Sequence, residues 1–224
     1  IEALGAYLAT ILSRTVDYMT NLCVWEKGAE EVKHVFMRWA LPITWDFAEA
    51  NPLSSVERFY AGGLNSAFQV IDRLYECEWK TVPAPNILNQ SAIVGVNETV
   101  DVIFTDPPYY DAIPYSDLMD FFYVWLRRSL IGLSSQIDST MENQLSPKWS
   151  HDDNDGELID DSSRHGGNSL AAKNAYENGM YRAFTAGYNK LSPDGRLIVV
   201  FANKNPSAWE TLVASIVRAG FCVT

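Results

Sequence analysis

Four consecutive residues, Asp106, Pro107, Pro108 and Tyr109, are the clearest candidates for chemistry in this sequence. They follow directly after the apolar run 100–105, which is typical of a buried strand. A carboxylate and a proline carbonyl can together accept hydrogen bonds from the two N–H groups of an amine. Proline suits the second role because its fixed φ holds the carbonyl in place and it has no N–H of its own.

An acceptor pair of this kind could activate the exocyclic amine of a nucleic-acid base. The lone pair of that amine is delocalised into the ring, and hydrogen bonds that draw the nitrogen toward tetrahedral geometry make it a better nucleophile. The expected acceptors are the Asp106 carboxylate and the Pro107 carbonyl. The carboxylate also favours the positive charge that develops as the amine attacks a sulfonium methyl. Tyr109 would stack on the base after it has left the double helix.

A plainer interpretation of the same residues is also available. Two prolines often end a strand and begin a turn, with Asp106 and Tyr109 as incidental neighbours. The context favours the chemical interpretation, because the motif stands between a strand pattern and an aromatic-rich helix pattern.

The second part of the chain has the pattern of an α/β fold. After Pro83 and Pro85, strands are expected at 86–94, 100–105 and 196–202, a turn at 192–195, and helices at 115–130, 170–191 and 206–219. This alternation predicts a parallel sheet with helices on its faces. Ligands bind at the carboxyl ends of such strands, so the loops after Thr105 and Ala202 should share one rim.

The first part of the chain, residues 1–85, is expected to be a helical segment packed on that core. Its helices are predicted at 3–22, 30–40 and 64–76. Residues 86–224 would form part of the α/β core. Within them, the acidic, Ser- and Asn-rich stretch at about 134–168 is expected to be a long loop.

Composition restricts the partners and the compartment. No apolar run reaches the roughly 18 residues needed to cross a bilayer, so no membrane partner is expected. The three cysteines and three histidines lack ligand spacing, which predicts reduced thiols, a cytoplasmic protein and no metal. The net charge of −11 opposes phosphate contacts. Much of the acidity lies between 138 and 161, which leaves room for local basic surface elsewhere.

The segment 105–118, TDPPYYDAIPYSDL, continues as 120–126 and closely resembles large prokaryotic adenine-specific DNA methylases. The segments 41–52 and 195–204, with 208–210, are similar to the same family. The resemblance runs from about residue 3 to the end and fades in the acidic stretch. It implies a Rossmann-like methyltransferase fold, S-adenosylmethionine as methyl donor, and transfer to N6 of adenine in DNA. The residues 106–109 would take the catalytic position.

Other residues near the expected rim are weaker candidates. Those for substrate binding are Tyr110, Asp111, Tyr115, Asn203 and Lys204. Tyr110 could equally pack inside the protein, and the last two could be a solvated strand end. Asp46 and Asn51, together with Asp106, are candidates for binding the donor, although helix capping would explain the first two as well.

The glycine-rich loop with which the family holds the methionine end of the donor has no counterpart here. Gly62 and Gly63 do not follow a strand pattern, so they are poor candidates. We therefore expect this chain to be an internal or C-terminal fragment, with the loop upstream of Ile1. On its own, such a fragment should bind the donor weakly or not at all and be inactive.

Four alternatives to adenine N6 in DNA stay open. Cytosine N4 is chemically close, but that reaction more often uses Ser where this chain has Asp106. Adenine in RNA is possible because nothing here distinguishes the sugar. A protein glutamine amide is a third target, usually with Asn at this position. The fourth is an inactive nucleic-acid-binding module, which the acidic charge and missing loop favour and the intact motif opposes.

Overall fold

The computed structural model of the 224-residue chain describes all residues except 38–39, 47, 55–58, 78–81, 111–112 and 147. The chain is mixed α/β and divides into two compact units. Unit 1 comprises residues 1–86 and 115–146, and unit 2 comprises 87–114 and 147–224. Each unit has a hydrophobic core of its own. Among the helices of the described residues, none is long and apolar enough to span a bilayer.

Unit 1 is built mainly from helices. Its elements are α1 (Glu2–Val16), β1 (Trp25–Glu26), β2 (Glu31–Val32), α2 (Tyr60–Glu76), α3 (Tyr115–Leu130) and α4 (Ser135–Thr140). The helix α1 packs against both α2 and α3. The short antiparallel pair β1–β2 leads into a small core, in which buried Cys23, Val35 and Phe36 meet Phe121 and Phe122 of α3.

The helix predicted at 30–40 is wrong over the described part of that range. Glu31 and Val32 form β2, and Glu30 takes a left-handed φ of 50° just before it. The backbone N–H of Val35 donates to both the carbonyl (2.9 Å) and the carboxylate (3.2 Å) of Asp17, directly after α1. These tertiary hydrogen bonds replace the helical ones that local periodicity favoured.

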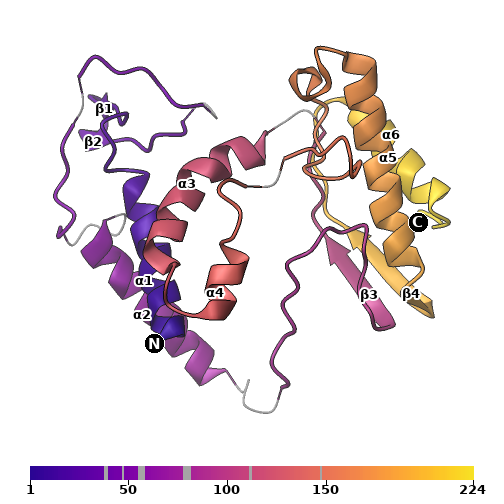
Figure 1. Cartoon of the computed structure of the whole chain (residues 1–224), viewed down its shortest axis with the longest axis horizontal. Helices are drawn as coiled ribbons and strands as arrows, with labels where there is room; N and C mark the ends of the chain where they lie inside the picture. The colour runs from indigo at the N-terminus through magenta and orange to yellow at the C-terminus, as the bar shows by residue number, and fades with distance from the viewer. Residues whose placement is uncertain (38–39, 47, 55–58, 78–81, 111–112, 147) are drawn as a thin grey trace. The chain divides into compact units, whose positions relative to one another are not determined.

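Unit 2 is a two-stranded parallel sheet with two long helices. Its elements are β3 (Val100–Thr105), the 3-10 helix η2 (Ser162–His165), α5 (Ser169–Tyr188), β4 (Leu191–Val199) and α6 (Pro206–Arg218). The helices α5 and α6 lie side by side (Figure 1). Their buried side chains form one core with the inward residues of β4, namely Leu197 and Val199.

The two helices begin and pack for reasons visible in their sequences. Asn168 caps α5 by accepting a hydrogen bond from Ala171 N (3.0 Å), and Asn205 caps α6 by accepting one from Ser207 N (3.0 Å). Pro206 occupies the first turn of α6, where its missing N–H costs nothing. Four of the five buried residues of α5 recur at every fourth position, namely Ala172, Tyr176, Met180 and Phe184, and the fifth is Gly179.

The strand predicted at 86–94 does not form. Residues 86–94 have no regular secondary structure, and Val94 N donates to Ser91 O (3.1 Å) in a local turn. Within the described residues, β3 therefore pairs with β4 alone. The turn predicted at 192–195 lies instead within β4, where the register shifts: Val100 pairs with Leu191, whereas Val102 pairs with Arg196.

The acidic stretch is more ordered than a long loop. It contains α4, a bridge between Ser150 and Asp155, and η2, and it divides between the two units. In unit 2 its Leu158 packs beside the core and Ile159 is buried. Arg164 pairs with both Glu157 and Asp161, which explains how an acidic segment stays folded.

Candidate functional site

The motif 106–109 stands at the carboxyl end of β3, as predicted. The last ladder bond joins Val200 N to Thr105 O (2.9 Å), and the chain leaves the sheet at the next residue. Asp106 is exposed, whereas Pro107 is buried. The only ionisable group of the motif other than the tyrosine phenol is thus accessible from solvent.

A cleft of about 640 Å³ runs beside β3 and includes the first three residues of the motif, 106–108, in its wall. The remaining wall comes mainly from β3, from the carboxyl-terminal half of α5 and from the irregular segment 88–96, with single contributions from Leu158, Lys190 and Leu197. Most of the lining is apolar, with a few polar groups. Small-molecule sites have this character and a volume of roughly 300–1,000 Å³, so the cleft is a suitable ligand site.

The backbone carbonyls after Pro107 are engaged inside unit 2. The Pro108 carbonyl accepts from the Tyr176 hydroxyl (2.7 Å) and from Tyr110 N (3.1 Å). The Tyr110 carbonyl accepts from Asp160 N (3.1 Å). By contrast, no residue in the described part of the chain donates to the Pro107 carbonyl.

A third bond comes from the loop after β4. Asn203 Nδ2 donates to the Tyr109 carbonyl (3.2 Å), while its Oδ1 accepts from Asn205 N (2.8 Å). Because a backbone N–H can only donate, the second bond fixes which end of the Asn203 amide faces the motif. The loops after β3 and β4 therefore meet at one rim, and that prediction is confirmed.

Tyr110 adopts a strained conformation. Its φ is 60°, in the left-handed region that a bulky aromatic residue rarely enters, at a cost of about 1–3 kcal/mol. Its ring is buried and meets the ring of Tyr176 edge-on, with centroids 5.2 Å apart. The packing alternative for Tyr110 is thus the one the structure favours, because a buried ring has no face to offer to a substrate.

Tyr176 is fully buried in the middle of α5. Burial raises the pKa of Tyr176 to about 12, against a smaller opposing effect of a backbone hydrogen bond from Tyr110. The hydroxyl therefore keeps its proton at any physiological pH and serves as a lasting donor to Pro108.

Tyr109 belongs to a group of three aromatic side chains. Its ring lies edge-on to Phe201 (centroids 5.2 Å apart), and Phe201 lies edge-on to Trp209 of α6 (5.0 Å). Trp209 Nε1 donates to the Asn203 carbonyl (2.9 Å), which ties the group to the same loop. Tyr109 is half-buried, and it is not among the residues that line the cleft.

The remaining predicted residues are spread over both units. Lys204 is exposed directly after Asn203 in unit 2. Tyr115, Asp46 and Asn51 belong to unit 1, where the Asn51 side chain accepts from Leu53 N (3.0 Å) in a local turn. Asp111 lies outside the described residues. The substrate and donor roles of these residues stay predictions.

Four residues around the motif were missed by sequence reasoning: Asp160, Tyr176, Phe201 and Trp209. Tyr176 carried a usable signal, because it is the one side chain with a hydroxyl on the buried stripe of a predicted helix. Asp160 carried no such signal, because it contacts Tyr110 through its backbone N–H and not through its side chain.

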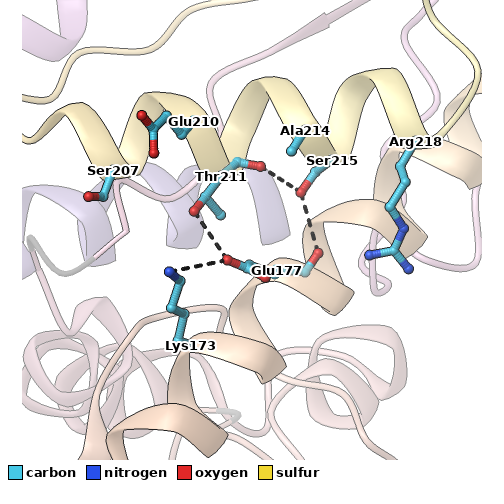
Figure 2. A pocket seen from close by; sticks show the side chains of 8 residues that line it. All are labelled: Lys173, Glu177, Ser207, Glu210, Thr211, Ala214, Ser215 and Arg218. Carbon is cyan, nitrogen blue, oxygen red and sulfur yellow. Dashed lines mark hydrogen bonds and ion pairs between the residues drawn. The ribbon is translucent and has the colours of Figure 1, made fainter.

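A second, smaller pocket of about 210 Å³ lies between α5 and α6 (Figure 2). Four of its polar side chains are linked by hydrogen bonds or an ion pair. Glu177 pairs with Lys173 (3.7 Å) and accepts from Thr211 Oγ1 (3.3 Å), and Ser215 Oγ lies 3.4 Å from the Glu177 carbonyl. These contacts join two helices, and none involves the motif.

The described residues contain no group of three or more His, Cys, Asp or Glu side chains placed to hold a metal ion. Comparison of the chain with protein-family models, with curated proteins and with solved structures found no match.

Proposed function

We propose that this protein is an S-adenosylmethionine-dependent methyltransferase with a Rossmann-like fold that modifies N6 of adenine in DNA. One observation carries the proposal. The carbonyls of Pro108, Tyr109 and Tyr110 are all engaged within unit 2, whereas Asp106 is exposed and no described residue donates to the Pro107 carbonyl. Within the described residues, the Asp106 carboxylate and the carbonyl of the buried Pro107 are thus the two acceptors of the motif that could receive the N–H groups of an amine.

In this mechanism, Asp106 and Pro107 each accept one N–H of the target amine and hold its lone pair toward the methyl donor. The carboxylate stabilises the positive charge on nitrogen as the N–C bond forms, and it then passes the surplus proton to water. When bound, the donor would supply an electrophilic methyl group, and its sulfur would leave as a neutral thioether. Tyr109, supported by Phe201 and Trp209, would stack on the flipped base.

The described residues fit the donor in part. The cleft beside β3 has a suitable volume, and Asp106 stands in its wall as an anionic group that could face a sulfonium cation. A glycine-rich turn at the end of a second strand, which the family resemblance implies, is not found among the described elements.

The direct test is Asp106→Ala in the full-length encoded protein, assayed on unmethylated DNA with nucleoside mass spectrometry. We expect methyl transfer to fall by at least about 10²–10³-fold, the loss typical of removing one preorganised electrostatic group. The fold should persist because Asp106 is exposed. Asp194→Ala, which removes an exposed carboxylate from the bulge of β4, should retain full activity.

The identity of the product separates the alternatives. N4-methylcytosine in DNA would move the proposal to cytosine, and N6-methyladenine in RNA alone would move it to RNA. Turnover that persists in Asp106→Ala would remove this carboxylate from the mechanism. Nucleic-acid binding without any methyl transfer by the wild type would leave the inactive binding module.

A further inference from the structure

One buried side-chain hydroxyl of α5 is bonded to the motif. Tyr176 Oη donates to the Pro108 carbonyl over 2.7 Å, and 68 residues of chain separate the two partners. The bond starts from a fully buried ring in the middle of α5, so the donor cannot swing away to water. It is the shorter of the two bonds to that carbonyl.

The same ring also supports the strained residue that follows. Tyr110 keeps its φ of 60° while its ring stands at 90° to that of Tyr176. A conformation of this kind persists only where the surroundings determine it fully. Here the surroundings are the Tyr176 ring on one side and the Asp160 N–H on the Tyr110 carbonyl.

The consequence falls on the residues just before Pro108. The rings of Pro107 and Pro108 fix the φ angles of both residues. Once the Pro108 carbonyl is held, few orientations remain for the Pro107 carbonyl. Fixing the Pro108 carbonyl therefore also restricts the Pro107 carbonyl and the Asp106 backbone at the cleft. A phenylalanine would fill the same space in the core, so packing alone does not require the hydroxyl.

We propose that Tyr176 is a positioning residue, whose hydroxyl and ring hold 106–110 in the geometry that grips the amine. The catalytic part of this inference rests on the proposed methyl transfer, whereas the structural part does not.

The test is Tyr176→Phe, which keeps the ring and removes the hydroxyl. In hydrogen exchange, we expect the amides of Tyr110 and Asp160 to exchange about tenfold faster, the effect of losing one buried hydrogen bond. The kcat for methyl transfer should fall by about 10–100-fold, because a misplaced acceptor pair costs mainly rate. The KM for the donor should stay within about twofold, and the melting temperature should fall by only a few degrees.

The matched control is Tyr181→Phe on the same helix. Tyr181 lies beneath the guanidinium of Arg218 (4.0 Å from its ring), and that contact needs no hydroxyl. Exchange at Tyr110 and kcat should both match the wild type. A general loosening of α5 would instead affect both variants alike.

Two results would overturn the inference. Unchanged exchange at Tyr110 and Asp160 in Tyr176→Phe would show that the hydroxyl does not hold the motif. Faster exchange with an unchanged kcat would show that the Tyr176 hydrogen bond does not contribute to the rate of methyl transfer. Failure of the proposed function is a separate outcome: the wild type would transfer no methyl group, the positioning role would fall with it, and exchange would still decide whether Tyr176 holds the loop.

Discussion

The two walls of the cleft in unit 2 are held in opposite ways. The motif and the residue after it, 106–110, are bonded to three distant parts of the chain, through Tyr176, Asn203 and Asp160. The facing segment 88–96 is bonded largely to itself, for example from Gln90 Nε2 to the Gly95 carbonyl (2.5 Å). One wall is thus bonded to the core, whereas the hydrogen bonds of the other are mostly local.

This difference indicates which wall of the cleft must hold its groups in well-defined positions. Catalytic groups act well only when their supporting contacts lock them in place, and those contacts belong to rigid elements. A wall that only encloses a ligand can tolerate movement. Changes at the fixed wall should therefore affect rate, and changes at the loose wall should affect local order alone.

Apart from the Asp106 and Tyr176 variants described above, the largest expected effect is at Tyr109. Tyr109→Ala should raise the KM for DNA by about 5–150-fold, since stacking on one base contributes about 1–3 kcal/mol. Steady-state kinetics at varied DNA concentration would measure it. Tyr109→Phe keeps the ring and should stay near the wild type. Unchanged kinetics in the alanine variant would argue against stacking by this residue.

A smaller effect is expected at Asn203, which donates to the Tyr109 carbonyl. Asn203→Ala should lower kcat by about tenfold, because one of three supports of the fixed wall is lost. It should also cost about 0.5–1.5 kcal/mol of unfolding free energy per lost bond, measured by chemical denaturation.

Asn205→Ala is the matched control for Asn203. It removes the cap of α6, where Oδ1 accepts from Ser207 N (3.0 Å), at a similar cost of about 0.5–2 kcal/mol. Its kcat should match the wild type, because its side chain supports no motif carbonyl. Equal losses of activity in both variants would mean that stability, and not the fixed wall, governs the rate.

The smallest effect is expected at the loose wall. Gln90→Ala removes a bond that closes the segment 88–96 on itself. Hydrogen exchange within that segment should become faster, while kcat and melting temperature stay at wild-type values. A kcat reduced as strongly as in Asn203→Ala would contradict the contrast between the walls.

Local patterns predicted the elements that depend on local sequence. The bounds of β3 and α3 agree with the apolar run 100–105 and the helical pattern 115–130, and α6 ends one residue before the predicted end. The parallel pairing followed from the alternation of strands and helices. The position of Asp106 at a strand end was predictable because it directly follows the apolar run 100–105.

The contacts that complete the site join residues far apart in sequence. The burial of Tyr110 depends on Tyr176, and its left-handed φ depends on a backbone N–H in the acidic stretch. Neither partner leaves a periodic signal near the motif. The expected helix at 30–40 failed for a related reason, because Asp17 binds the backbone of Val35.

The central claim is that Asp106 and the Pro107 carbonyl hold an amine while it is methylated. Mass spectrometry of DNA nucleosides from cells with and without the intact gene tests it most directly. We predict N6-methyladenine in DNA when the gene is present, its loss when the gene is deleted, and no recovery with a gene carrying Asp106→Ala. Equal amounts of methylated nucleosides in all three strains would contradict the claim.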